Sequence, residues 1–235
     1  MVTYEILFNL GLLVTCYCYI ILVIYFSGRI KSSISRKFLH IMIGNFVFII
    51  PFFTFNEFPL NFPFLVAAPF VAITFLASPY SPIKSLTLKM HGLTAITDGG
   101  HHLGLFLYAV SYTILAGLFA SQPYLIAVGI LPMAYGDAAA ALIGKKFGKH
   151  QYCVFAKKSF EGSAAMFIVT VICLLASGFF FIVFTQIPAV NIFKISIAAA
   201  VISVIAEAIT PKGFDNITIP LLSVLIALFL FGGTI

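Results

Sequence analysis

Eight long apolar runs constrain this sequence more than any other feature. A helix needs roughly 20 apolar residues to span a bilayer, and such runs fall at about 5–27, 38–55, 62–78, 103–120, 123–143, 162–184, 191–209 and 216–233. Of the 235 residues, 62% are hydrophobic and only 9% are charged, whereas soluble domains carry about 25% charged residues. The composition excludes a soluble enzyme, a nucleic-acid-binding domain and a disordered regulator. It predicts an all-α polytopic integral membrane protein with about eight transmembrane helices.

The basic residues are distributed unevenly between the loops that join these runs. Of the 13 lysines and arginines, only Lys194 falls outside one alternate set of loops. Cytoplasmic loops of membrane proteins collect Lys and Arg, so this set is predicted to be cytoplasmic. Both termini then lie on the non-cytoplasmic side. The net charge of +6 is accordingly interpreted as membrane topology and not as affinity for nucleic acid.

Most of the seven carboxylates fall at or near predicted cytoplasmic helix ends, namely Asp98, Asp137, Glu161, Glu207 and Asp215. A carboxylate inside a bilayer costs ~2.5–3.5 kcal/mol on insertion scales. We therefore expect these acids to share a polar site, although any one of them can instead be an ordinary interfacial cap. The four cysteines show no zinc-binding spacing, so neither a disulfide framework nor a structural metal is expected.

The segment YGDAAAALIGKKFGKH combines an acid, small residues and lysines. The alanines after Asp137 allow close helix approach, and an acid on such a seam suits Mg²⁺, which takes one or two carboxylates plus substrate phosphates. Gly144 and Gly148 flank Lys145, and Lys149 follows; glycines let backbone N–H groups approach phosphate oxygens, and lysines add positive charge. The spacing is not that of a Walker A loop. The alternative is a positive-inside cluster that anchors a helix end.

The next segment, KKSFEGSAAMF, places Lys157, Lys158 and Ser159 at the start of a new apolar helix. Helix N-termini bind anions through free N–H groups and the helix dipole. Two lysines and a hydroxyl at this point therefore indicate a phosphate site. Glu161 can hold the cation that neutralises those phosphates, or it can cap the helix N-terminus.

A third group of polar residues lies near the C-terminus. Glu207 sits near a membrane exit, and Pro211 and Gly213 then break the helix before the pair Asp215–Asn216. The oxygens of this pair suit Mg²⁺, and a cap on the last helix is an equally good interpretation.

A fourth group lies in the second apolar run, where Arg36, His40 and Gly44 recur every four residues and share one helix face. His40 can orient a lipid alcohol, hydrogen-bond a phosphate or act as acid or base, and a purely structural role stays open. No role is assigned to Asp98 or to the histidines of the same loop, His91, His101 and His102.

Taken in order, these motifs resemble those of the membrane CTP-dependent lipid kinases, a family that includes phytol kinases, dolichol (polyprenol) kinases and CTP-dependent diacylglycerol kinase and is similar to phosphatidate cytidylyltransferase-like proteins. The likeness rests on RKFLHIMIG, YGDAAAALIGKKFGKH, KKSFEGSAAM and EAITPKGFDNITIPL, from about Arg36 to Pro220. It implies transfer of the γ-phosphoryl group of CTP to a membrane lipid alcohol, giving lipid monophosphate and CDP. It also implies nucleotide binding by a cytoplasmic loop at about 144–161.

The resemblance and the residue chemistry together assign three sets of residues. The catalytic set is Asp137, His40, Arg36 and Glu207. The nucleotide-binding set is Gly136, Gly144, Lys145, Gly148, Lys149, Lys157, Lys158, Ser159, Glu161 and Gly162. The metal set, for Mg²⁺, is Asp137, Glu161, Asp215 and Asn216. The arginine and histidine are expected to face the acceptor hydroxyl, whose proton goes to Asp137 or Glu207.

We therefore expect one transmembrane catalytic domain over residues 1–235, active on the cytoplasmic side of a prokaryotic plasma membrane or an endoplasmic-reticulum-type membrane. Its partners are a lipid alcohol (polyprenol or dolichol, phytol or geranylgeraniol), CTP and Mg²⁺, and an oligomer is possible. The nearer alternatives are a cytidylyltransferase that makes a CDP-lipid from a lipid phosphate, and a diacylglycerol kinase. A transporter is more distant, because transporters usually show paired repeats and midplane charges.

Overall fold

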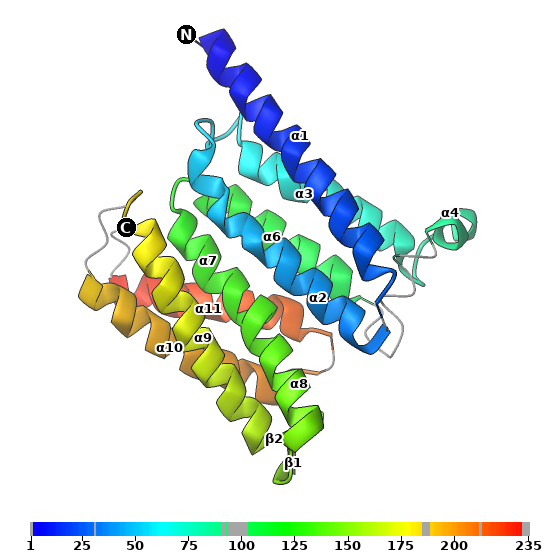
Figure 1. Cartoon of the computed structure of the whole chain (residues 1–235), viewed down its shortest axis with the longest axis vertical. Helices are drawn as coiled ribbons and strands as arrows, with labels where there is room; N and C mark the ends of the chain where they lie inside the picture. The colour runs from blue at the N-terminus through cyan, green and yellow to red at the C-terminus, as the bar shows by residue number, and fades with distance from the viewer. Residues whose placement is uncertain are drawn as a thin grey trace. The chain divides into compact units, whose positions relative to one another are not determined.

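The computed structural model describes residues 2–30, 32–90, 93, 103–184, 189–211 and 213–231. The chain divides into two compact units, Met1–Ser121 and Gln122–Ile235. Nearly all of the described regular structure is helical, as the apolar runs predict (Figure 1). Asp98, His91, His101 and His102 lie outside the described residues.

The first unit is built from helices that follow its apolar segments. These are α1 (Val2–Ser27), α2 (Ser32–Gly44), the short 3₁₀ turns η1 (Asn45–Phe48) and η2 (Ile50–Phe52), α3 (Phe62–Ala77), α4 (Lys84–Lys89) and α6 (Gly104–Phe119). α1 packs against α2 and α3, and α3 lies along α6 (Figure 1). Asn61 caps α3 by accepting from the N–H of Phe64 at 2.8 Å, and its amide donates to the carbonyl of Ala116 on α6 at 3.0 Å. One buried polar side chain thereby joins both helices.

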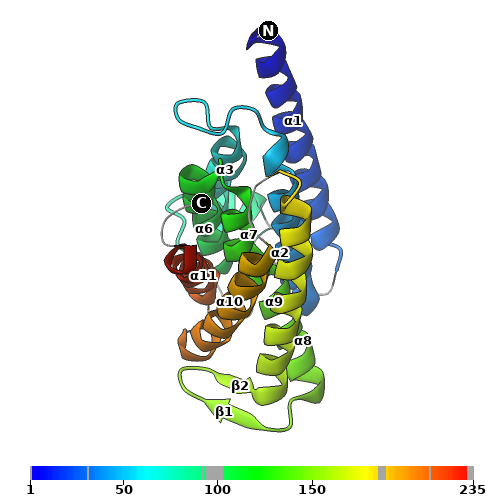
Figure 2. The same ribbon diagram turned by 90° about the vertical axis from the view of Figure 1, so that its left-hand side faces the viewer.

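The second unit holds most of the predicted site. Its elements are α7 (Pro123–Leu131), η3 (Pro132–Gly136), α8 (Asp137–Phe147), β1 (Gln151–Cys153), β2 (Lys157–Ser159), α9 (Phe160–Phe181), α10 (Ala189–Ile209) and α11 (Asp215–Phe231). α9 packs against α7, α8 and α10, and α11 packs against α7 and α10 (Figures 1 and 2).

The segments α7, η3 and α8 form one helical rod with a π-helical turn in its middle. Pro132 has no backbone N–H and cannot continue the regular hydrogen-bond pattern. Within the turn, the N–H of Asp137 donates to the carbonyl of Pro132, five residues earlier, where a regular α-helix joins residues four apart. Such turns occur frequently at functional sites, and this one directly precedes the acid that opens α8.

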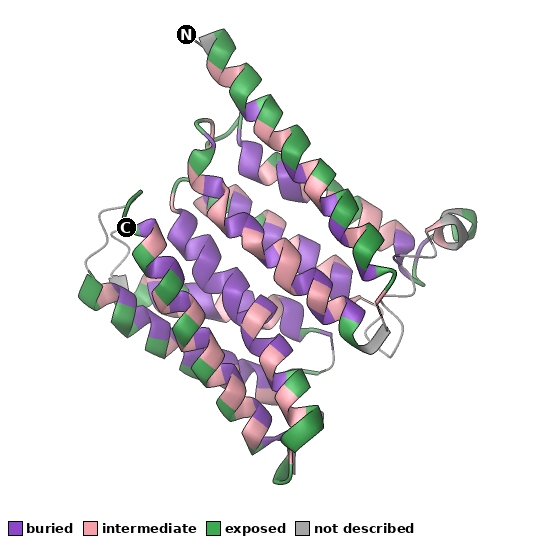
Figure 3. Ribbon diagram, in the orientation of Figure 1, coloured by how far each residue is buried: buried purple, intermediate pink, exposed green. Residues whose placement is uncertain are grey.

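The apolar helices confirm that this is an all-α membrane protein. Among the described residues, five helices are long and apolar enough to cross a membrane, namely Thr3–Ser27, Ile34–Phe52, Pro123–Phe147, Phe160–Phe181 and Ala189–Ile209. Phe62–Ala77, Gly104–Phe119 and Asp215–Leu230 are shorter apolar helices. Each predicted apolar run thus falls on a helix, whereas the count of eight spans and the side of the termini stay predictions. Figure 3 shows exposed stretches along α9 and α10. The exposed side chains of these helices include the apolar Phe179 and Phe193, as expected for helices in contact with lipid.

The segment at 144–161 differs from the loop that the sequence predicts. α8 continues to Phe147, and β1 and β2 then pair as an antiparallel hairpin that leads directly into α9 (Figure 2). In its register Gln151 lies opposite Ser159 and Cys153 opposite Lys157. The hairpin escapes prediction because each strand is only three residues long and lacks the alternation of apolar and polar residues that identifies a strand.

Candidate active site

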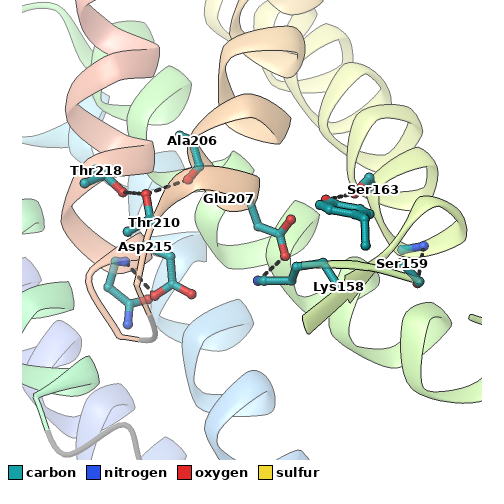
Figure 4. A network of polar contacts seen from close by, with 11 residues as sticks. Lys158, Ser159, Ser163, Ala206, Glu207, Thr210, Asp215 and Thr218 are labelled. Carbon is teal, nitrogen blue, oxygen red and sulfur yellow. Dashed lines mark hydrogen bonds and ion pairs between the residues drawn. The ribbon is translucent and has the colours of Figure 1, made fainter. Parts of the chain in front are cut away.

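Four charged side chains of the second unit converge beside the hairpin. Lys158 extends from β2 and forms an ion pair with Glu207 on α10, and Figure 4 shows it pointing toward both Glu207 and Asp215. Asp137 and Asp215 interact electrostatically with the same ammonium group. All three acids are buried, with exposed fractions of 3% for Glu207, 5% for Asp137 and 8% for Asp215. We call these four residues the acid–lysine cluster; it unites members of three separate sequence motifs.

The hairpin determines which of two adjacent lysines enters the cluster. Side chains alternate between the two faces of a strand. Lys157 is accordingly exposed, whereas the Lys158 side chain is only 22% exposed and points inward. The hydroxyl of Tyr152 lies 2.7 Å from that of Ser163 and fixes the hairpin to α9. The sequence did not distinguish the two lysines, and Tyr152 was missed because no motif includes it.

The acids keep Lys158 charged. Burial by itself lowers the pKa of the Lys158 ammonium, but Glu207, and with it Asp137 and Asp215, outweighs burial, so the pKa is raised above its ordinary value. The lysine therefore remains a cation throughout the neutral range. A charged lysine at this position can bind phosphate oxygens.

One carboxylate oxygen of the cluster is left without a hydrogen bond within the described ranges of the chain. Three buried carboxylates face one ammonium group, and Oε2 of Glu207 has no hydrogen-bond partner among the described residues. A buried carboxylate oxygen without a partner is costly, so Oε2 of Glu207 can accept an added proton donor or cation. In the described part of the chain, no three His, Cys, Asp or Glu side chains gather closely enough to hold a metal by themselves. Mg²⁺ usually combines one or two carboxylates with substrate phosphates, and a metal role for Asp137 and Asp215 stays a prediction.

Three of the predicted nucleotide-binding glycines pack around Ser159 where α8 meets α9. A Cβ atom on Gly144 would lie 3.1 Å from the Ser159 hydroxyl oxygen, and one on Gly148 would lie 2.7 Å from it. The N–H of Gly148 donates to the carbonyl of Gly144 at 3.0 Å, and that of Gly162 donates to the Ser159 hydroxyl at 3.1 Å. Two of the N–H groups expected at phosphates are thus engaged within the protein. The geometry supports a packing role, and phosphate contact by these residues stays a prediction.

Gly136, the last residue of η3, is also packed too closely for a larger side chain. A Cβ atom there would collide with the hydroxyl of Thr170 and lie 3.3 Å from Cγ of Met166, both on α9. A glycine is therefore required for η3 to approach α9 this closely. This explains its presence without a ligand.

Glu161 is paired with His150 and not with Lys158. Its Oε1 lies 2.7 Å from Nδ1 of His150 and accepts from the backbone N–H of the same residue at 3.1 Å. These contacts tie the segment before β1 to the first turn of α9. The geometry favours a role for Glu161 in shaping the hairpin over one as a metal ligand.

The remaining predicted lysines form an exposed basic surface around the hairpin. Lys145, Lys149 and Lys157 are all exposed. Lys145 and its neighbour Lys146 lie in the last turn of α8, where positive charge complements the helix dipole. Clustered positive charge also attracts polyphosphates from a distance, so both interpretations of the sequence remain physically sound.

The start of α11 supports both roles weighed for Asp215 and Asn216. The N–H of Asn216 donates to Oδ1 of Asp215 at 2.9 Å, so this carboxylate satisfies one of the free N–H groups in the first turn of α11. Gly213 has a φ of 90°, a conformation that favours glycine, and it turns the chain between α10 and α11. Because the Asp215 carboxylate also interacts with Lys158, capping does not remove it from the cluster.

Arg36 and His40 belong to the first unit. Arg36 is half-buried, and His40 is 1% exposed on α2. The His40 ring stacks on Tyr108 with a centroid distance of 4.5 Å and an interplanar angle of 16°. Its backbone carbonyl also accepts from the Tyr108 hydroxyl at 2.9 Å. His40 thus supports α6, and a catalytic role for it stays a prediction.

Comparison with known proteins identifies the family. A phytol kinase from Synechocystis sp. is 34% identical over 204 residues, which cover 83% of this chain and 78% of that protein. A probable chloroplastic phytol kinase from Triticum aestivum is 28% identical over 87% of this chain and 70% of its own length. A probable chloroplastic phytol kinase from Glycine max is 26% identical over 86% of this chain and 67% of its own length. No family model and no solved structure matches the chain. The chain therefore belongs to the phytol kinase family, and the enzyme class predicted from the sequence, a kinase acting on a lipid alcohol, is confirmed.

Proposed function

We propose that this protein transfers the γ-phosphoryl group of CTP to the hydroxyl group of phytol or a closely related isoprenoid alcohol in the membrane. The observation that carries this proposal is the acid–lysine cluster, in which buried carboxylates of α8, α10 and α11 surround one charged lysine. Phosphoryl transfer requires mainly positioning and charge neutralisation. The phytol kinases named above favour phytol as the first acceptor to test.

Each member of the cluster has a separate task in this proposal. Lys158 binds phosphate oxygens of the nucleotide. Oε2 of Glu207, which has no partner among the described residues, accepts the proton of the alcohol. The alcohol oxygen then bonds to the terminal phosphorus as the bond from that phosphorus to the bridging oxygen breaks. The products are lipid monophosphate and CDP.

Asp137 and Asp215 are the residues that would hold Mg²⁺. When bound, the ion neutralises phosphate charge that develops during transfer. The exposed lysines around the hairpin raise the local concentration of nucleotide.

We further propose that the hairpin faces the cytoplasm, in a topology of eight spans with both termini outside. The positive-inside rule supports this orientation. Cys153 is exposed in β1 and reports the side directly. With the other three cysteines replaced by serine, a membrane-impermeant maleimide should label Cys153 in inverted vesicles and, in right-side-out vesicles, only after permeabilisation. Labelling of intact right-side-out vesicles would reverse the orientation.

The activity is tested with purified protein in detergent, Mg²⁺, γ-labelled CTP and phytol, geranylgeraniol, a polyprenol or diacylglycerol as acceptor. Label in an extractable isoprenoid phosphate, with CDP released in equal amount, is the expected result. Incorporation of the cytidylyl group, with pyrophosphate released only when a lipid phosphate is supplied, would identify a cytidylyltransferase instead. Preference for diacylglycerol or for ATP would refute the assigned acceptor or donor.

A pair of variants tests the assigned base. Glu207→Gln should lower kcat about 10²–10⁴-fold, the usual contribution of general acid–base catalysis. Glu57→Gln is the matched control, because Glu57 is an exposed acid of the first unit and should retain full activity. Equal activity of the two variants would exclude Glu207 as the base.

A further inference from the structure

The first unit contains an apolar pocket between α1, α2, α3 and α6. Its cavity volume is about 70 Å³, and its whole atom-free space, which includes open solvent, is about 620 Å³. An apolar cavity of this order can hold a hydrocarbon group, and it is too small for a nucleotide. Its wall includes Ile20, Ile43, Phe46, Val66, Phe70 and Leu105.

The pocket wall presents almost no polar atom. None of the described lining residues is charged. The hydroxyl of Thr74 donates to the carbonyl of Phe70 at 2.5 Å, and that of Tyr108 donates to His40 at 2.9 Å. Only the Tyr112 hydroxyl lacks a hydrogen-bond partner among the described residues. A charged or strongly polar ligand would lose its hydration here without compensation, so the pocket suits a hydrocarbon.

We infer that this pocket holds part of the isoprenoid chain of the alcohol substrate. The inference rests on the proposed function, because that function supplies a membrane molecule with a long branched chain. The bilayer offers such a chain a surrounding as apolar as the pocket. Selection must therefore come from shape, since close packing against fixed side chains depends on chain branching and width.

The wall of the pocket is held rigidly where α2 meets α6. Tyr108 lines the pocket and is fixed in two ways by His40, through ring stacking and through the backbone carbonyl. A fixed aromatic wall discriminates between chain shapes better than a mobile one. His40 is then a positioning residue for the acceptor chain, one turn along α2 from Arg36.

Photolabelling tests this inference independently of turnover. The wild-type protein in detergent is irradiated with a phytol analogue that carries a diazirine on its chain, without nucleotide, and labelled peptides are mapped. We expect label on α3 and α6 residues of the pocket, reduced at least about fivefold by excess phytol and less by a straight-chain alcohol of equal length. Label confined to other helices, or equal competition by the two alcohols, would overturn the inference. If the protein phosphorylates phytol but the label falls outside the pocket, the pocket assignment is refuted and the proposed function stands. If the label falls in the pocket but phytol is not phosphorylated, the proposed function is refuted and the pocket still binds the chain.

Two variants on one helix provide the matched test in the active enzyme. Ala67 lines the pocket and Ala72 is exposed, both on α3. Ala67→Phe fills the pocket and should raise the KM for phytol about tenfold or more, while the KM for CTP and turnover of a short prenyl alcohol are retained. Ala72→Phe should change none of these values. An unchanged KM for phytol in Ala67→Phe would refute the inference. If that variant fails to fold, the smaller Ala109→Val substitution on α6 replaces it and should raise the KM for phytol about threefold. An unchanged KM in Ala109→Val would likewise refute the inference.

Discussion

Replacing Lys158 by methionine should destabilise the protein more than replacing any one of the acids around it. The ammonium forms the ion pair with Glu207 and also attracts Asp137 and Asp215, so its loss removes the partner of Glu207 and a positive charge that all three acids share. Removing one partner of a buried ion pair costs about 3–5 kcal/mol. Glu207→Gln should cost less, about 1–2 kcal/mol, because the lysine keeps two other acids and the amide oxygen still accepts a hydrogen bond.

The double variant gives the sharper result. Once Lys158 is methionine, removing the negative charge of Glu207 relieves repulsion, so Lys158→Met with Glu207→Gln should be about 1–3 kcal/mol more stable than the sum of the single effects predicts. Thermal unfolding in detergent, followed by far-UV circular dichroism, measures this at about 2–4 °C per kcal/mol. Lys157→Met is the matched control, because this neighbour is exposed and should shift stability by less than about 0.5 kcal/mol. Equal effects of the two lysine variants, or additive effects in the double variant, would refute the shared counter-charge.

Three further predictions follow from individual contacts. Asp137→Asn should raise the Mg²⁺ concentration for half-maximal activity at least about tenfold, whereas Glu57→Gln should not; identical Mg²⁺ titrations would contradict the metal role. Glu161→Gln weakens the contacts with the segment before β1, so steady-state kinetics should show a severalfold higher nucleotide KM with kcat retained; a fall in kcat alone would indicate direct participation in catalysis. Gly148→Ala should lower stability by about 1–3 kcal/mol, because its Cβ would lie 2.7 Å from a hydroxyl oxygen. Gly11→Ala is the control, since a Cβ there would meet no atom within 4 Å beyond its chain neighbours and its own helix backbone, and equal melting temperatures would contradict the packing role.

Much of the fold was predictable because membrane helices are encoded locally. An apolar run of sufficient length must satisfy its backbone hydrogen bonds internally in lipid, so it becomes a helix whatever its neighbours are. Every predicted run accordingly coincides with a helix. The hairpin was not predictable in this way, because its strands are held by contacts such as Tyr152 with Ser163 and not by a pattern of their own.

The residues of the candidate site were likewise predictable only in part. The sequence identified Asp137, Glu207 and Asp215, because buried acids are costly in a membrane protein and conspicuous in a chain with few charges. It also indicated the family, through the resemblance of its motifs, and the similarity to phytol kinases confirms it. It grouped Glu161 with these acids and treated neighbouring lysines alike, because spacing along a chain says nothing about which face of a short strand turns inward.

By itself, then, the sequence determined the membrane helices, the polar residues that membrane helices can rarely tolerate and the family. Only the tertiary structure decided that Lys158 and not Lys157 meets the acids, that Glu161 binds His150, and that the glycines pack around Ser159. The physical reason is the distance along the chain over which each interaction acts. Helix formation and the cost of burying charge depend on each segment alone, whereas an ion pair, a close helix crossing or a pocket exists only once distant segments are in contact.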